Sequence, residues 1–71
     1  MRYLVVVERG KEGWGAHVPD LPGCIAAAET REEALRLIRE AITFHIEGLQ
    51  EAGETVPSPS SEGEVIEVEA A

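Results

Sequence analysis

Few residues of this chain could do chemistry: two histidines (His17 and His45), one cysteine (Cys24) and one aspartate (Asp20). Histidine titrates near neutral pH, a thiolate is a nucleophile and carboxylates bind metal ions. Neither histidine has a His, Cys or Asp neighbour at the spacing of a metal-ligand set. A magnesium-dependent nuclease needs several converging carboxylates, whereas the glutamates here fall on one predicted helix face, in turns or near the C-terminus. We therefore predict no catalytic residue, no metal site and no cofactor.

Structural roles explain these residues better. Small apolar neighbours at the start of a predicted strand favour an inert, buried Cys24 thiol, and both histidines are expected in structural or interface positions. Asp20 lies in a Val-Pro-Asp-Leu-Pro-Gly turn, where its carboxylate is expected to accept hydrogen bonds from loop amides. Trp14 is expected in the core or at a subunit interface, because RNA readers present aromatic side chains together with a basic surface.

The charge of the chain is strongly acidic. Its 71 residues include 6 Lys or Arg and 14 Asp or Glu, a net charge of −8. Nucleic-acid binding needs clustered basic residues, so we expect none, and instead expect attraction to a basic protein. No apolar run approaches the roughly 20 residues of a membrane span or resembles a secretory signal. These features predict a cytoplasmic protein that does not contact a membrane.

The hydrophobic pattern predicts four strands and one helix. Alternating or β-branched residues mark the strands, whereas apolar positions three and four residues apart mark the helix. Thr30 and Glu33 form a predicted capping box at the helix start, and Gly53 supplies its stop. The predicted strands cover residues 2–8, 14–18, 24–28 and 64–69, the helix covers residues 31–52, and a Pro/Ser loop covers residues 54–63.

The element order β-β-β-α-β predicts an α+β fold of two layers, with one helix packed on a four-stranded mixed sheet. A right-handed crossover and the apolar character of the first strand on both faces place that strand centrally, giving the order 4-1-2-3. In the last strand, Ile66 and Val68 are expected to face inward. The helix covers only one face, and its end near Phe44 is expected to project beyond the sheet.

A small core and an uncovered sheet face predict self-association as a dimer or a higher homo-oligomer. The predicted interface combines residues of the first hairpin with one aromatic residue of the helix: Tyr3, Val5, Val7, Trp14 and Phe44.

Four motifs together resemble one family, the HicB-like antitoxins. They are Ala-His-Val-Pro-Asp-Leu-Pro-Gly-Cys at 16–24, Thr-Arg-Glu-Glu-Ala at 30–34, Glu-Ala-Ile at 40–42 and Gly-Glu-Thr-Val-Pro-Ser-Pro at 53–59. The resemblance implies a partial ribonuclease H-like fold without catalytic carboxylates. It also implies a partner, since HicB proteins bind HicA, a small basic RNA-cleaving toxin, and block its active site. Many HicB proteins carry a C-terminal DNA-binding region, and we expect residues 1–71 to be a single HicB-like domain without that extension.

Three functions follow as hypotheses. The leading one is a non-enzymatic, antitoxin-like module that neutralises a HicA-like toxin by direct binding. Its predicted toxin contacts are acidic: Asp20, Glu29, Glu67 and Glu69. The alternative is a stand-alone homo-oligomeric regulatory or scaffold protein without a toxin partner. An enzyme such as a degenerate nuclease is the least favoured, because the carboxylates that it needs do not cluster in the sequence.

Overall fold

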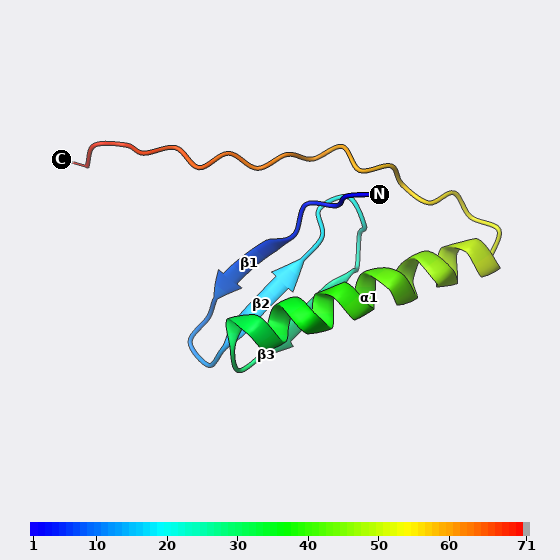
Figure 1. Ribbon diagram of the computed structural model, residues 1–71, viewed down its shortest axis with the longest axis horizontal. Helices are drawn as coiled ribbons and strands as arrows, with labels where there is room; N and C mark the ends of the chain where they lie inside the picture. Colours follow the sequence, from blue (N-terminus) through cyan, green and yellow to red (C-terminus); the bar gives the residue numbers. More distant parts are fainter. Residues whose placement is uncertain (71) are drawn as a thin grey trace.

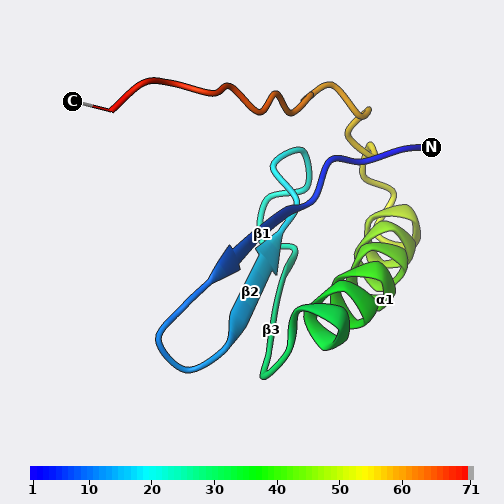
Figure 2. The ribbon, with the colours of Figure 1, turned by 60° about the vertical axis from the view of Figure 1, so that its left-hand side comes forward.

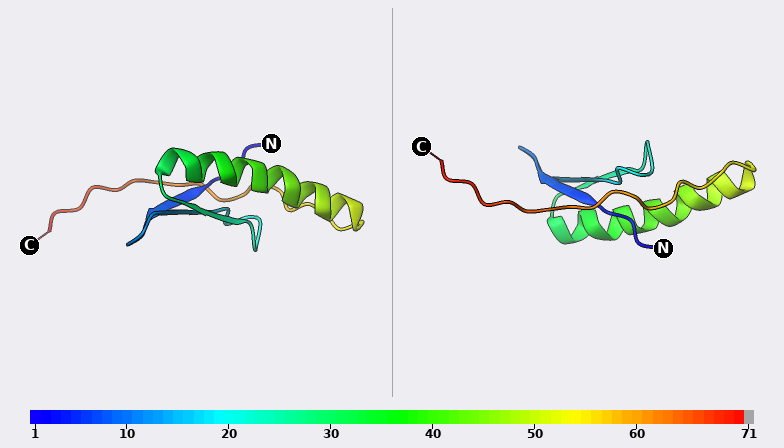
Figure 3. Two further views of the ribbon diagram at one scale, coloured as in Figure 1. Left: turned by 90° about the horizontal axis from the view of Figure 1, so that it is seen from below. Right: turned by 90° about the horizontal axis from the view of Figure 1, so that it is seen from above.

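Three short strands and one long helix form two layers, with the helix on one face of the sheet (Figures 1 and 3). The computed structural model describes residues 1–70, and Ala71, the last residue of the expected domain, lies outside the described residues. The sheet is antiparallel throughout, in the order β1-β2-β3. The elements are β1 (Val6–Arg9), β2 (Trp14–His17), β3 (Ile25–Ala28) and α1 (Arg31–Glu51).

Two turns connect the strands. The β1–β2 turn is closed by a hydrogen bond from the Gly10 amide to the Gly13 carbonyl at 2.7 Å. A Cβ atom on Gly13 would lie 2.4 Å from the carbonyl oxygen of Ala28, so only glycine lets the hairpin approach β3 this closely. In the second turn, the amide of Leu21 donates to the carbonyl of Val18 at 3.0 Å. That turn folds the Leu21 side chain fully into the core.

Local signals fix both ends of α1. The Thr30 hydroxyl accepts a hydrogen bond from the amide of Glu33 at 3.2 Å, which confirms Thr30 as the N-cap. The Glu33 carboxylate pairs with Arg36 on the next turn. At the other end Gly53 adopts a φ of 71°, a left-handed conformation that favours glycine. The predicted helix is thus confirmed to within one residue at its C-terminal end.

The core lies between α1 and the face of the sheet that carries Ala16. In the register, Ala16 lies opposite Val7 on β1 and opposite Ala26 on β3, so these three side chains share that face. Alanines there let the helix pack closely, with Ile38 inserted at 2% exposure. The buried residues are Ala16, Val18, Leu21, Cys24, Ala34 and Ile38.

The predicted four-stranded mixed sheet with the order 4-1-2-3 is wrong. Residues 64–69 are extended but pair with no strand within residues 1–70. The first strand is shorter than predicted, because β1 begins at Val6, and it lies at an edge of the sheet rather than at its centre. Figure 2 shows the C-terminal segment leaving the body and running apart from β1.

A carboxylate clasp explains why the fourth strand does not form. One oxygen of Asp20, Oδ2, accepts hydrogen bonds from the amides of Ser60 and Ser61, both at 2.8 Å. The other, Oδ1, accepts from the hydroxyl of Ser61 at 2.7 Å and from that of Ser60 at 3.2 Å. The Tyr3 hydroxyl adds a hydrogen bond to the carbonyl of Pro57. The chain is therefore pinned at residues 57–61, and beyond Gly63 it diverges from its own β1 (Figure 2).

The clasp also sets the acidity of Asp20. The amides of Ser61 and Ser60, followed by the Ser61 hydroxyl, lower the pKa of this carboxyl from 3.8 to about 2. Hydrogen bonds to the ionised form stabilise the charge, so the clasp is stronger when Asp20 is ionised than when it is protonated.

We expect Ile38→Ala to destabilise the protein by about 2–5 kcal/mol, because it removes buried methyl groups and leaves a cavity beneath the sheet. Urea unfolding followed by circular dichroism measures the change. Val65→Ala is the matched control: Val65 is 97% exposed, and its loss should cost less than about 0.5 kcal/mol. Similar losses for the two variants would contradict this placement of the core.

We expect the clasp to respond to acid at an unusually low pH. Because the pKa of Asp20 falls from 3.8 to about 2 on folding, its stabilising contribution is fully present above the unfolded pKa. That contribution is lost as the pH falls through about 2. NMR shifts of the Ser60 and Ser61 amide protons should titrate with that low midpoint. Asp20→Asn should make these amides exchange with solvent several-fold faster, whereas Ser58→Ala should not. A midpoint near 3.8 would contradict the clasp.

Candidate functional site

The segment after the clasp is the most exposed part of the molecule. We call residues 62–70 the acidic tail, since they include Glu62, Glu64, Glu67 and Glu69. Every residue of the acidic tail is exposed. Its apolar side chains are no exception, with exposed fractions of 97% for Val65, 73% for Ile66 and 79% for Val68. The tail extends the molecule to 51 Å along its longest axis.

The acidic tail has the composition of a strand without having a partner in the described chain. Val65, Ile66 and Val68 are β-branched residues, which favour extended backbone. In an extended segment, Ile66 and Val68 lie on one face, whereas Val65 and Glu67 lie on the other. Unpaired backbone groups and exposed apolar side chains are the features by which one protein adds a strand to another. The tail is therefore suited to binding a protein.

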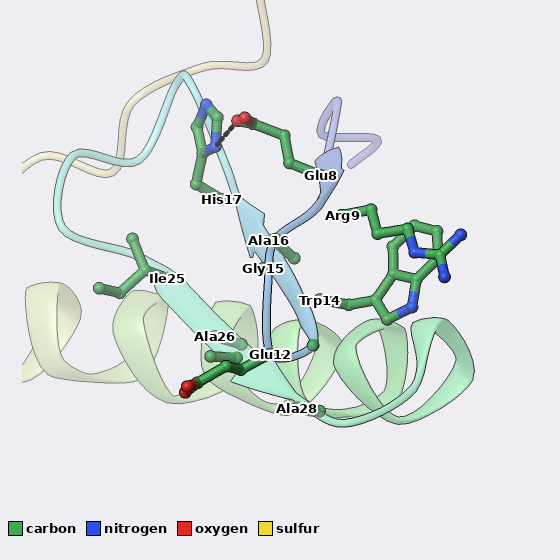
Figure 4. A pocket seen from close by; sticks show the side chains of 13 residues that line it. Glu8, Arg9, Glu12, Trp14, Gly15, Ala16, His17, Ile25, Ala26 and Ala28 are labelled. Atoms are coloured by element: carbon green, nitrogen blue, oxygen red, sulfur yellow. Dashed lines mark ion pairs between the residues drawn. The ribbon is translucent and has the colours of Figure 1, made fainter.

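The face of the sheet opposite α1 is a second exposed surface (Figure 4). The register places Val6, His17 and Ile25 in one row across it, and Ile25 is 71% exposed. The next row begins with Glu8, whose Oε1 lies 3.8 Å from Nδ1 of His17. Gly15 has no side chain, which leaves a shallow hollow lined by all three strands. This face thus mixes apolar and polar groups.

Aromatic and basic groups meet at the hairpin end of the sheet. The Arg9 guanidinium carbon lies 5.9 Å from the centre of the Trp14 ring, within the range of a cation–π contact. Arg9 lies opposite Trp14 in the sheet, and Trp14 lies opposite Ala28. By register these three residues belong to the helix side of the sheet. Trp14 therefore packs within its own chain.

Four of the five predicted interface residues lie on the helix side of the sheet and not on its uncovered face. Tyr3 and Val5 pack against the core beneath the helix. Val7 and Trp14 share that face by register. Phe44 alone is strongly exposed, at 78%, on α1. The interface assignment remains a prediction, and the uncovered face displays other residues.

The four predicted toxin contacts are also dispersed. Asp20 is occupied by the clasp, Glu29 is exposed between β3 and α1, and Glu67 and Glu69 lie on the acidic tail. Sequence reasoning missed the serine pair that holds Asp20. The available signal was a single aspartate in a turn, together with the two adjacent serines that follow the prolines of the loop.

The potentially reactive side chains do not cluster within residues 1–70. Cys24 is a buried free thiol, and burial raises its pKa, which keeps it protonated and unreactive. Within residues 1–70, no three His, Cys, Asp or Glu side chains gather where they could hold a metal ion. No helix of the described chain is both long and apolar enough to cross a membrane.

Comparison with known proteins agrees on one family. A family profile described as the HicB_like antitoxin of bacterial toxin-antitoxin system matches residues 3–70. The UPF0150 protein Ta0767 of Thermoplasma acidophilum is 38% identical over 63 residues, covering 87% of this chain and 91% of that protein. Antitoxin HicB 2 of Photorhabdus laumondii is 36% identical over 64 residues, which is 90% of this chain and 46% of that protein.

Two further matches extend the comparison. An uncharacterized 14.9 kDa protein of Haemophilus phage HP1 is 44% identical over 57 residues, 80% of this chain and 43% of its own length. The chain thus spans less than half of the phage and Photorhabdus proteins. Among solved structures, a chain of a HicA3 and HicB3 toxin-antitoxin complex is 32% identical with a TM-score of 0.72, covering 84% of this chain and 70% of that one. From its fold, its motifs and these relatives, the chain belongs to the HicB-like antitoxin family.

Proposed function

We propose that this protein is a non-enzymatic antitoxin that neutralises a small, basic, HicA-like RNA-cleaving toxin by direct binding. The observation that carries the proposal is the acidic tail, an extended segment with four glutamates that is exposed throughout and pairs with no strand within residues 1–70. Membership of the HicB-like family supports the antitoxin role. The likeness to a chain from a complex of HicA3 with HicB3 supports the class of partner.

Electrostatics supports a basic partner. A net charge of −8 on 71 residues steers a cationic protein toward this one and speeds their encounter. Glu67 and Glu69 on the tail, together with exposed Glu29, are the side chains we assign to toxin contact. Asp20 acts indirectly, because its carboxylate holds the segment from which the tail departs.

The absence of catalysis is part of the proposal. The single aspartate is engaged with Ser60 and Ser61, and the single thiol is buried. Either group would have to leave its present partners or surroundings to act on a substrate. Binding needs no such rearrangement, because the tail is already exposed.

Co-expression with a HicA-like toxin, if one is encoded beside its gene, tests this function. We expect growth arrested by the toxin to resume when the protein is induced, and the purified pair to form a complex without loss of the toxin chain. A toxin that still arrests growth, or a purified pair that does not associate, would contradict neutralisation by binding. A chain with no such toxin gene nearby would instead support the stand-alone homo-oligomer.

We expect the double charge reversal Glu67→Lys/Glu69→Lys to weaken toxin binding about tenfold and to reduce its dependence on salt, because it replaces attraction with repulsion. Titration calorimetry at two salt concentrations measures both effects. Glu47→Lys/Glu51→Lys is the matched control, with the same charge change on exposed residues of α1. Equal weakening by both variants would show that only net charge matters and would contradict the assignment to the tail.

A further inference from the structure

Each chain carries an unpaired strand edge and an unpaired strand. β1 pairs only with β2, so its other edge is free within residues 1–70. The acidic tail is extended and rich in β-branched residues, yet it has no partner in that part of the chain. Free edges and exposed β-segments are features that soluble proteins normally cover.

The tail does not cover the edge of its own β1. The clasp holds Ser60 and Ser61 on Asp20, and Gly63 still lies close to the body, because an added Cβ there would lie 3.3 Å from Leu4 Cδ1. Beyond this point the tail runs in the same general direction as β1 but diverges from it (Figures 1 and 2). The direction suits parallel pairing, whereas the separation prevents it within one molecule.

We propose that two copies of this chain exchange their acidic tails, each tail pairing in parallel with the free β1 edge of the other copy. The three-stranded sheet of the single chain is unchanged, and the added strand comes from a different molecule. This exchange does not rest on the proposed antitoxin function, because it requires no toxin.

A second copy is the occupant best matched to both features. Every copy offers the same edge and the same tail, so one exchange satisfies both and closes with two-fold symmetry. Charge does not decide between occupants: Arg9 ends β1 and Arg2 precedes it, but Glu8 lies on the same edge strand, and the incoming tail is acidic. Like charge elsewhere on the two copies opposes association, so the contact must be made by the strand itself.

The pattern of the tail fixes which side chains become buried. When the tail pairs with β1, its alternation can place Ile66 and Val68 on the sheet face that carries Val5 and Val7. That leaves Val65, Glu67 and Glu69 on the uncovered face. Exchange therefore shelters the two apolar residues together and keeps the two glutamates that we assign to toxin contact exposed. The same segment can join two copies and present acidic groups to a third protein.

The pair Ile66→Asp and Val65→Asp tests the exchange, since these neighbouring residues receive the same change on opposite faces. We expect the wild-type protein to sediment at about twice its 7.7 kDa chain mass. Ile66→Asp should weaken that dimer at least about tenfold, because a buried apolar side chain is lost to a charge. Val65→Asp should leave it nearly unchanged. A wild-type monomer at micromolar concentration, or equal effects of the two variants, would overturn the proposal.

Disulfide trapping distinguishes exchange from any other dimer. Val6 lies on the uncovered face of β1, the face on which Val65 is placed by the exchange. We expect a mixture of a Val6→Cys chain with a Val65→Cys chain to form a crosslinked pair on oxidation, and either chain alone to form far less. The double variant Val6→Cys/Val65→Cys should likewise crosslink between chains. A crosslink confined to single chains, or a dimer that never traps, would overturn the exchange.

Discussion

One aspartate holds the point from which the acidic tail, about an eighth of this chain, leaves the body. The Asp20 carboxylate joins the turn between β2 and β3 to serines 40 and 41 positions later, closing a long loop against its entropy. Four hydrogen bonds to a single ionised group make that closure specific. Because the chain is held there, the segment beyond it leaves the body and β1 stays at the edge of a three-stranded sheet. The point at which the acidic tail leaves the body follows from this contact.

The body of the protein is built around a small core between the helix and the sheet. One helix covers one face of the sheet, and the alanines of β2 and β3 let Ile38 and Leu21 fill the space between the layers. The opposite face tolerates water because His17 and Glu8 interrupt its apolar residues. The sequence predicts self-association through that face, whereas the exposed apolar side chains are concentrated on the tail.

The sequence predicted those parts of the structure that depend on residues close together in the chain, and it did not predict the part that depends on distant residues. The helix ends were predictable because Thr30 and Gly53 act on their own backbone neighbours. The β1–β2 hairpin and the β3 segment were also predictable, because their signals are local patterns of apolar and β-branched residues. The fourth strand was not, because alternation at residues 64–69 reports a preference for extended backbone and says nothing of which edge is within reach. The trajectory was set by Asp20 and two serines far away in sequence, and no local pattern links them.

The glutamates between the apolar residues of the tail have a consequence for solubility. An exposed β-branched segment is a template on which identical segments can stack without limit, at a spacing of about 4.8 Å. In such a stack Glu64, Glu67 and Glu69 would form ladders of like charge, whose repulsion opposes fibril growth. Before the segment pairs with a partner, its own acidic side chains thus oppose open-ended polymerisation.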